Sequence, residues 1–155
     1  MFLQYGCSHD RMREDGVLAD YEGLNMSAAS EAAWLREYGD EQMRRFDREP
    51  EAFERLLALL AEYGSEELAD RTLSRVDRHI RQETLPDGEI LDMAGRMLAV
   101  LNSEVFAESE GFTDRKRAQI ADMADRLEKR LREREPDGDW RHALELIRRI
   151  CENAQ

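Results

Sequence analysis

Two short pairs of carboxylates stand at a spacing that could hold a divalent metal ion: Glu51-Ala-Phe-Glu54 and Glu67-Leu-Ala-Asp70, with 12 residues between them. Several carboxylates that converge on Mg²⁺ can hold a triphosphate and position a water molecule for hydrolysis. Geometry weighs against convergence, because both pairs open predicted helices, and in an antiparallel hairpin turning at Gly64 they would lie on the order of 20 Å apart. Acids also occupy 35 of the 155 positions, so pairs of this form arise by chance. The metal site is therefore the less favoured interpretation, and no cofactor is predicted.

The same pairs resemble the pattern of all-α nucleoside-triphosphate pyrophosphohydrolases, in which Glu-x-x-Glu is followed by Glu-x-x-Asp. The resemblance covers only residues 51–70. It implies Mg²⁺-dependent hydrolysis of a nucleotide by Glu51, Glu54, Glu67 and Asp70, and this activity is kept as an alternative hypothesis. The chain as a whole is not assigned to a family.

The second candidate site is a run of acidic side chains without matching bases. The chain carries 35 acids and 23 bases, a net charge of −12, and Arg96 is the one base between residues 82 and 110. A field of this sign repels phosphate backbones, so we expect no direct nucleic-acid binding but a protein partner with a basic surface. The predicted partner-binding surface consists of the seven acids of this stretch: Glu83, Asp87, Glu89, Asp92, Glu104, Glu108 and Glu110.

Basic side chains also gather on one predicted helix. Four arginines follow one another there at steps of four, three and three: Arg71, Arg75, Arg78 and Arg81. Such a stripe could contact phosphates or an acidic partner. The favoured interpretation is a solvated helix surface, because acid-first pairs four residues apart recur along the chain, an order that stabilises a helix by about 0.2–0.5 kcal/mol per pair. Nine such pairs are Asp40–Arg44, Glu41–Arg45, Glu51–Arg55, Glu67–Arg71, Asp77–Arg81, Asp122–Arg126, Asp125–Lys129, Glu128–Arg132 and Glu145–Arg149.

Cysteine and histidine do not stand at metal-ligand or catalytic spacing. Cys7 is a candidate for exposure in the N-terminal arm, whereas Cys151 falls on the core stripe of its helix and is expected to be buried. Two cysteines form no disulfide scaffold, so a reducing cytoplasm is the predicted compartment. The uninterrupted apolar runs, such as residues 56–61 and 97–101, are too short for a membrane span, and no membrane association is expected.

Apolar periodicity predicts an all-α fold, a compact and mainly antiparallel bundle of five or six helices. Residues 1–25 lack a sustained period and are expected to form an irregular arm, with at most a short helix near 10–20, whereas residues 26–155 form a single helical domain. The predicted helices are 28–47, one that begins at Pro50 and stops at Gly64, one capped by Ser65, 88–107, one capped by Thr113, and one after the turn at 136–139. Helix 88–107 is apolar on nearly every side and belongs at the centre.

A similarity between two segments of the sequence favours a minor alternative, a short helical-hairpin repeat. Pro-Asp-Gly followed by an acid occurs at 86–89 and again at 136–139, and apolar residues follow both in phase, 50 residues apart. Solenoids generally need three or more units, and this chain offers at most two. The bundle is therefore preferred.

These features favour a non-enzymatic protein-binding module whose negative helical surface occupies a basic, nucleic-acid-binding patch on a partner. Phage-encoded inhibitors of host defence, including anti-CRISPR proteins, are an analogy based on charge. The alternatives are a structural helical subunit of a larger assembly, with an exposed apolar face in residues 1–25, and the Mg²⁺-dependent hydrolase. The oligomeric state is left open.

Overall fold

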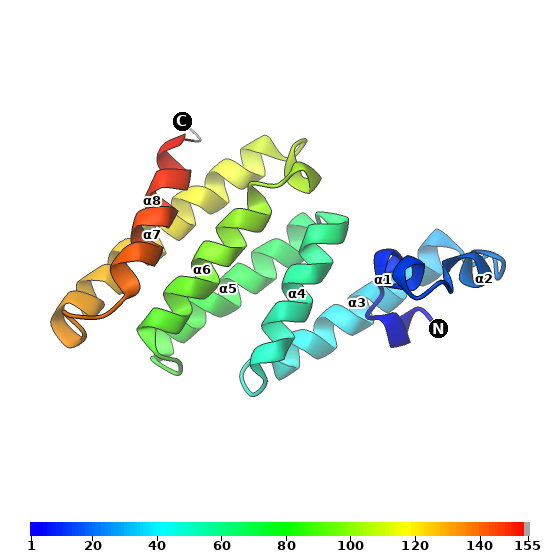
Figure 1. Ribbon diagram of the computed structural model, residues 1–155, viewed down its shortest axis with the longest axis horizontal. Coiled ribbons are helices and arrows are strands. Elements are labelled where there is room, and N and C mark those ends of the chain that lie inside the picture. The colour runs from blue at the N-terminus through cyan, green and yellow to red at the C-terminus, as the bar shows by residue number, and fades with distance from the viewer. Residues whose placement is uncertain (154–155) are drawn as a thin grey trace. The chain divides into compact units, whose positions relative to one another are not determined.

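The computed structural model describes residues 1–153, and these residues form helices and no strands. This confirms the predicted all-α fold. Ten helical elements follow one another, two of them short 3-10 helices (η): η1 Leu3–Tyr5, α1 His9–Glu14, α2 Leu18–Glu22, α3 Ala28–Arg45, α4 Pro50–Tyr63, α5 Glu66–Gln82, α6 Asp87–Leu101, η2 Glu104–Phe106, α7 Glu110–Arg134 and α8 Trp140–Asn153. Six of the α-helices are long, in line with the predicted five or six (Figure 1).

The chain forms two compact units, Met1–Tyr63 and Gly64–Gln155. In the first unit, α3 packs against α4, and α1 packs against α2 and η1. The N-terminal arm contributes to this core, because Phe2 is buried and the Tyr63 hydroxyl donates to the main-chain carbonyl of Cys7. The division into an arm and a domain at residues 25 and 26 stays a prediction.

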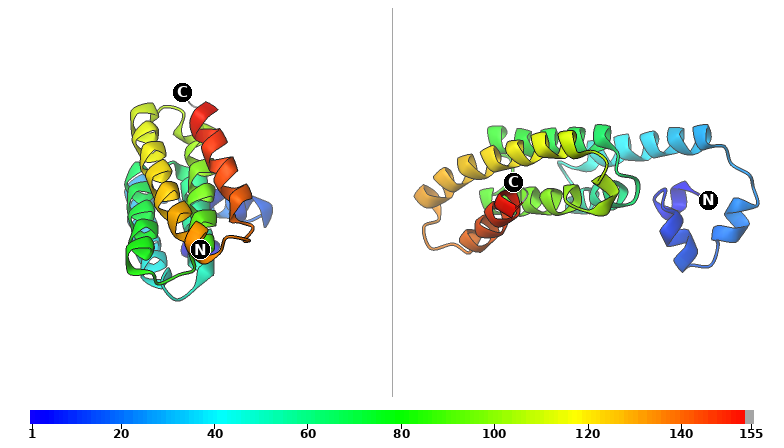
Figure 2. Two further views of the ribbon diagram at one scale, coloured as in Figure 1. Left: turned by 90° about the vertical axis from the view of Figure 1, so that its left-hand side faces the viewer. Right: turned by 90° about the horizontal axis from the view of Figure 1, so that it is seen from above.

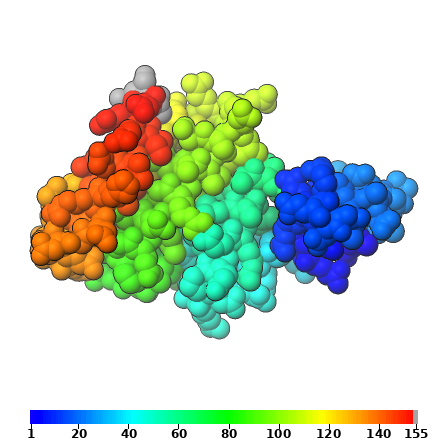
Figure 3. Space-filling model, in the orientation of Figure 1, coloured from blue at the N-terminus to red at the C-terminus, as the bar shows by residue number. Residues whose placement is uncertain are grey.

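The second unit consists of two helical hairpins, α5–α6 and α7–α8. Figure 2 shows α5 and α7 in one layer and α6 and α8 in the other, with successive helices running in opposite directions. Helix α6 packs against α5, α7 and α8. Within the second unit α6 thus has a central place, although one stripe of α6 stays open to solvent (Figure 3).

The second helix of each hairpin, α6 or α8, follows one of the two similar segments, 86–89 and 136–139. Ile90, Ala94, Met97 and Leu101 on α6 are in phase with Trp140, Leu144, Ile147 and Cys151 on α8, and all but Cys151 are buried. Helices α6 and α8 pack together at Gly95, where a Cβ would lie in ordinary van der Waals contact, 3.5 Å from Ile147 Cγ1. The second unit thus has the arrangement of the hairpin-repeat alternative within a compact all-α fold.

Helix boundaries agree with the predictions where the signal is a local cap. Helix α4 begins at Pro50, and the Ser65 hydroxyl accepts from the Leu68 N–H at 3.1 Å to cap α5. Two predictions are wrong. The helix expected over 88–107 ends at Leu101, and Thr113 does not cap α7 but lies buried inside it, donating to the Glu110 carbonyl at 3.0 Å.

Candidate acidic interaction surface

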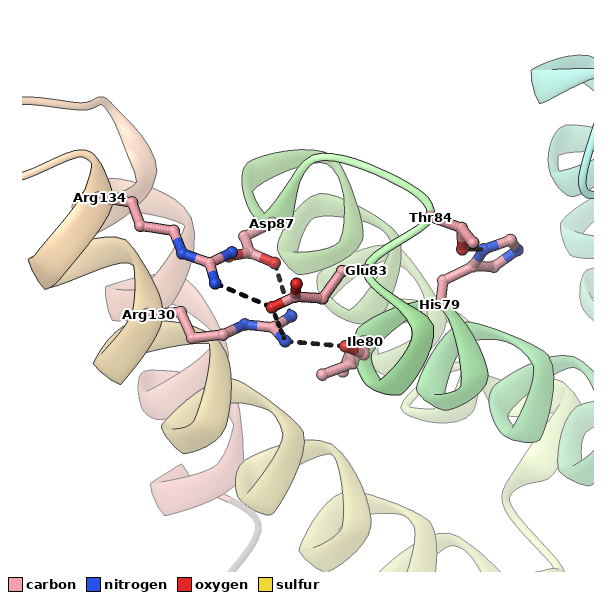
Figure 4. Close-up of polar contacts among 7 residues, drawn as sticks. All are labelled: His79, Ile80, Glu83, Thr84, Asp87, Arg130 and Arg134. Atoms are coloured by element: carbon pink, nitrogen blue, oxygen red, sulfur yellow. Dashed lines mark hydrogen bonds and ion pairs between the residues drawn. The ribbon is translucent and has the colours of Figure 1, made fainter.

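The turn between α5 and α6 brings two of the predicted contact residues, Glu83 and Asp87, against two arginines of α7 (Figure 4). Arg130 Nη2 lies 2.6 Å from Asp87 Oδ1, and Arg134 Nη2 lies 2.9 Å from Glu83 Oε1. A second set of contacts crosses the first, since Arg130 also reaches Glu83 and Arg134 also reaches Asp87. The two carboxylates are compensated within the chain.

The backbone explains why these four side chains meet. Helix α5 ends at Gln82, and the left-handed φ of 52° at the C-cap residue Glu83 turns the chain toward α6. Arg130 also donates to the main-chain carbonyl of Ile80 at 2.8 Å, which satisfies an orphan carbonyl in the last turn of α5. The side chain of Asp87 is only 8% exposed, so this carboxylate ties the turn to α7.

Electrostatics agree with this assignment. The hydrogen bond from Arg134 is the main cause that lowers the pKa of Glu83 below its usual range, and Glu83 in turn raises the pKa of Arg134. Neither Glu83 nor Asp87 therefore presents an uncompensated charge to a partner.

The other five predicted contact residues are exposed, and none of them forms an ion pair within residues 1–153. Glu89 and Asp92 lie on the open stripe of α6, Glu104 lies on η2, Glu108 lies in the loop after it, and Glu110 begins α7. We refer to these five residues as the α6–η2 acidic surface: Glu89, Asp92, Glu104, Glu108 and Glu110.

Several bases elsewhere in the second unit form ion pairs with other acids. Arg148 donates to Glu128 at 2.8 Å, which is the main cause that lowers the pKa of Glu128, and it also contacts Asp125 at 3.3 Å. Lys116 pairs with Asp70 across α5 and α7. The negative charge of the α6–η2 acidic surface is thus left without these bases as partners.

The predicted solvated helix surfaces are present in part. Among these acid-first pairs, ion pairs join Glu41 to Arg45, Asp77 to Arg81, Asp122 to Arg126, Glu128 to Arg132 and Glu145 to Arg149. On the arginine stripe of α5, Arg81 contacts Asp77 at 3.2 Å, while Asp77 also pairs with Arg126 of α7.

The four carboxylates of the alternative magnesium site lie on different units. Glu51 and Glu54 belong to the first turns of α4, and Glu67 and Asp70 belong to α5. Among residues 1–153, no three His, Cys, Asp or Glu side chains are grouped so that they could hold a metal ion. The fourth member of the predicted set, Asp70, is occupied by Lys116.

Both cysteines differ from their predicted surroundings. Cys7 is fully buried rather than exposed, and this burial is the main cause that raises its pKa to about 12. Cys151 is half-buried, and desolvation raises its pKa too. A thiol that stays protonated is a poor nucleophile, so neither cysteine is activated.

A pocket in the first unit has no counterpart in the sequence analysis. It is lined by residues of α1, α2, the following loop and α3, with a volume of about 380 Å³. Inside it the carboxylate of Glu31 accepts from the Tyr21 hydroxyl at 2.7 Å and contacts His9 Nε2 at 3.2 Å. Positions 9, 21 and 31 follow no motif, so the folded arm alone brings these residues together.

Comparisons of this chain with protein-family models, with curated proteins and with solved structures find no match. Over residues 1–153, none of the helices has both the length and the apolar character that a bilayer span requires.

Proposed function

We propose that this chain is a non-enzymatic protein-binding module whose α6–η2 acidic surface engages a basic, nucleic-acid-binding patch on a partner protein. A module that occupies such a patch would exclude the nucleic acid and act as an inhibitor, in the manner of phage-encoded anti-defence proteins such as anti-CRISPR proteins. This analogy is one of charge.

The observation that carries the proposal is the contrast between paired and unpaired carboxylates in the second unit. Asp70 and Asp77 of α5 and Glu128 of α7 pair with basic side chains, whereas the five residues of the α6–η2 acidic surface are exposed and lack ion pairs in the described chain. An uncompensated field attracts positive charge and steers association.

The extent of the surface suits a protein partner. Helix α6 has 15 residues and is therefore about 22 Å long, and the acidic residues run from its first turn to the start of α7. A standard interface buries about 800 Å² on each partner, and a stripe of this length can form one side of it.

The test compares two tagged variants that lose the same charge. One carries Glu89→Gln, Asp92→Asn, Glu104→Gln, Glu108→Gln and Glu110→Gln. The control carries Glu14→Gln, Asp20→Asn, Glu133→Gln, Glu135→Gln and Asp137→Asn, five exposed acids that form no ion pair in residues 1–153. The wild-type chain is used to capture proteins from a lysate of the native host, and these proteins are eluted with rising salt and identified. Each complex of the chain with a captured protein is then purified.

We expect the wild-type chain and the control to retain a basic partner that moderate salt releases. The first variant should bind this partner at least about tenfold more weakly. A DNA or RNA oligonucleotide should compete with the wild-type chain for that partner. Equal retention by both variants, or a partner indifferent to the oligonucleotide, would sink the proposal.

A second candidate, a subunit of a larger assembly, is favoured by one observation. Four of the five large apolar side chains that are exposed in residues 1–153 lie in the first 26 residues: Met1, Leu3, Leu24 and Met26. An obligate interface is more hydrophobic than a transient one. This candidate predicts a partner that stays bound in high salt and is released by Leu24→Glu but not by the acidic-surface variant.

A further inference from the structure

The pocket of the first unit is built around one anchored carboxylate, that of Glu31. Tyr21, whose side chain is buried, donates its hydroxyl hydrogen to Glu31 Oε1, and desolvation is the main cause that raises the pKa of Tyr21, so this hydroxyl stays a donor. His9 Nε2 lies 3.2 Å from both carboxylate oxygens. Glu31 is thereby held in one orientation and is still 21% exposed toward the pocket.

Aromatic rings hold His9 in place on the other side. The ring of Phe2 meets that of His9 edge to face with centroids 5.2 Å apart, and Tyr21 lies at 5.9 Å. The positions of His9 and Glu31 therefore depend on packing in the core of the unit, which gives a rigid polar floor rather than a set of mobile surface side chains.

The walls combine apolar and acidic groups. Leu18 and Met26 supply apolar surface, and Glu22 supplies a second carboxylate, exposed at the end of α2. The one guanidinium of the lining, Arg13, pairs with Asp10 at 2.9 Å. With His9 neutral, the charges of Glu22, Glu31, Asp10 and Arg13 sum to −2, and with His9 protonated the sum is −1.

We propose that this pocket binds an alkylammonium group, such as the side chain of a lysine or one end of a small diamine. An ammonium ion has three donors for the free lone pairs of Glu31 and for Glu22. Its alkyl stem fits against Leu18 and Met26, and the Tyr21 ring adds cation–π attraction. The volume of about 380 Å³ is in the range of small-ligand pockets.

This site lies in the first unit and does not depend on the acidic surface of the second. Titration calorimetry at constant pH with cadaverine, with Nα-acetyl-lysine methylamide and with 1-pentanol tests it. We expect either amine to bind saturably and 1-pentanol, which has the stem without the charge, to bind at least about tenfold more weakly. Cadaverine binding alone identifies a free amine as the ligand, and binding of the lysine derivative identifies a protein side chain.

Two substitutions locate the site. Glu22→Gln removes an exposed carboxylate and should weaken amine binding about threefold to tenfold, and Glu31→Gln, which can still accept from Tyr21, should weaken it further. Asp20→Asn makes the same change of charge on α2 outside the pocket lining and should leave the affinity unchanged. The melting temperature of each variant reports whether it folds. The proposal is overturned if neither amine saturates, or if Asp20→Asn weakens binding as much as Glu22→Gln does.

Discussion

Arg130 Nη2 lies 2.6 Å from Asp87 Oδ1, although the two residues are 43 positions apart in the chain. The contact joins the first residue of α6 to the penultimate turn of α7, beside a carbonyl of α5. Together with the Glu83–Arg134 pair it separates the acids of the 82–110 stretch into two groups, one paired with arginines of α7 and one exposed without an ion pair in the described residues.

Removal of the Asp87 carboxylate should therefore destabilise the protein. Asp87→Ala leaves a guanidinium that is only 22% exposed without its best acceptor, and we expect the free energy of unfolding to fall by about 2 kcal/mol. Denaturant unfolding measures this change. Glu89→Gln, two residues away on the exposed stripe, is the control and should stay within about 0.5 kcal/mol of wild type. A neutral Asp87→Ala variant would show that the ion pair does not hold the turn.

The stability of the second unit should fall in acid partly through Glu128. Arg148 lowers the folded-state pKa of Glu128 below the ordinary value of 4.5, so its contribution is present above that value and is lost as the pH falls through the lower folded pKa. Glu128→Gln should be less stable than wild type at neutral pH, and the difference should shrink as the pH falls below the ordinary value. Urea unfolding across this range checks it, and a constant difference would contradict the assignment.

The two thiols should react at very different rates. With a pKa of about 12, Cys7 has a thiolate fraction on the order of 10⁻⁴ at pH 8, and it is also inaccessible. We expect Ellman's reagent to modify one cysteine of the native chain, Cys151, and to modify both in denaturant. Cys151→Ser should leave the native protein unreactive; rapid modification of that variant would mean that the arm does not cover Cys7.

Two glycines of the second unit should respond to alanine in opposite directions. Gly64 has a φ of +61°, and a Cβ there would lie 2.7 Å from the carbonyl oxygen of Val105, so Gly64→Ala should cost about 2 kcal/mol or more. Gly95 is inside α6 with ordinary contact distance to Ile147, and Gly95→Ala should stabilise the protein by about 0.5–1 kcal/mol. Thermal unfolding of both variants measures the pair, and equal shifts of one sign would contradict the packing described.

The features that sequence analysis predicted correctly are local ones. Pro50 and Ser65 act within one helical turn, so the starts of α4 and α5 follow from the residues themselves. The end of α6 could not be predicted in this way. Val100, Val105 and Phe106 continue an apolar pattern, and the chain leaves the helix at Asn102 while the Ser103 hydroxyl donates to the Val100 carbonyl.

The spacing of apolar and charged residues in the sequence did not predict contacts between distant segments. Asp87 and Glu89 look alike in an acidic stretch, and only the position of α7 shows that one is paired and the other is not. The arm 1–25 has no period because its short helices bury single residues such as Phe2, Met12 and Tyr21 instead of a regular stripe. The pocket around Glu31 was not predicted either, because its residues come from several short segments that share no period.

The central claim is that the α6–η2 acidic surface, and not the total charge of the chain, binds the partner. The measurement that tests it most directly is the dissociation constant of the purified complex from about 50 to about 300 mM salt, for wild type, for the five-residue acidic-surface variant and for the matched control. The account predicts that affinity falls steeply with salt for wild type and control, and that the acidic-surface variant binds weakly with a shallow salt dependence. Identical curves for the two variants would contradict it.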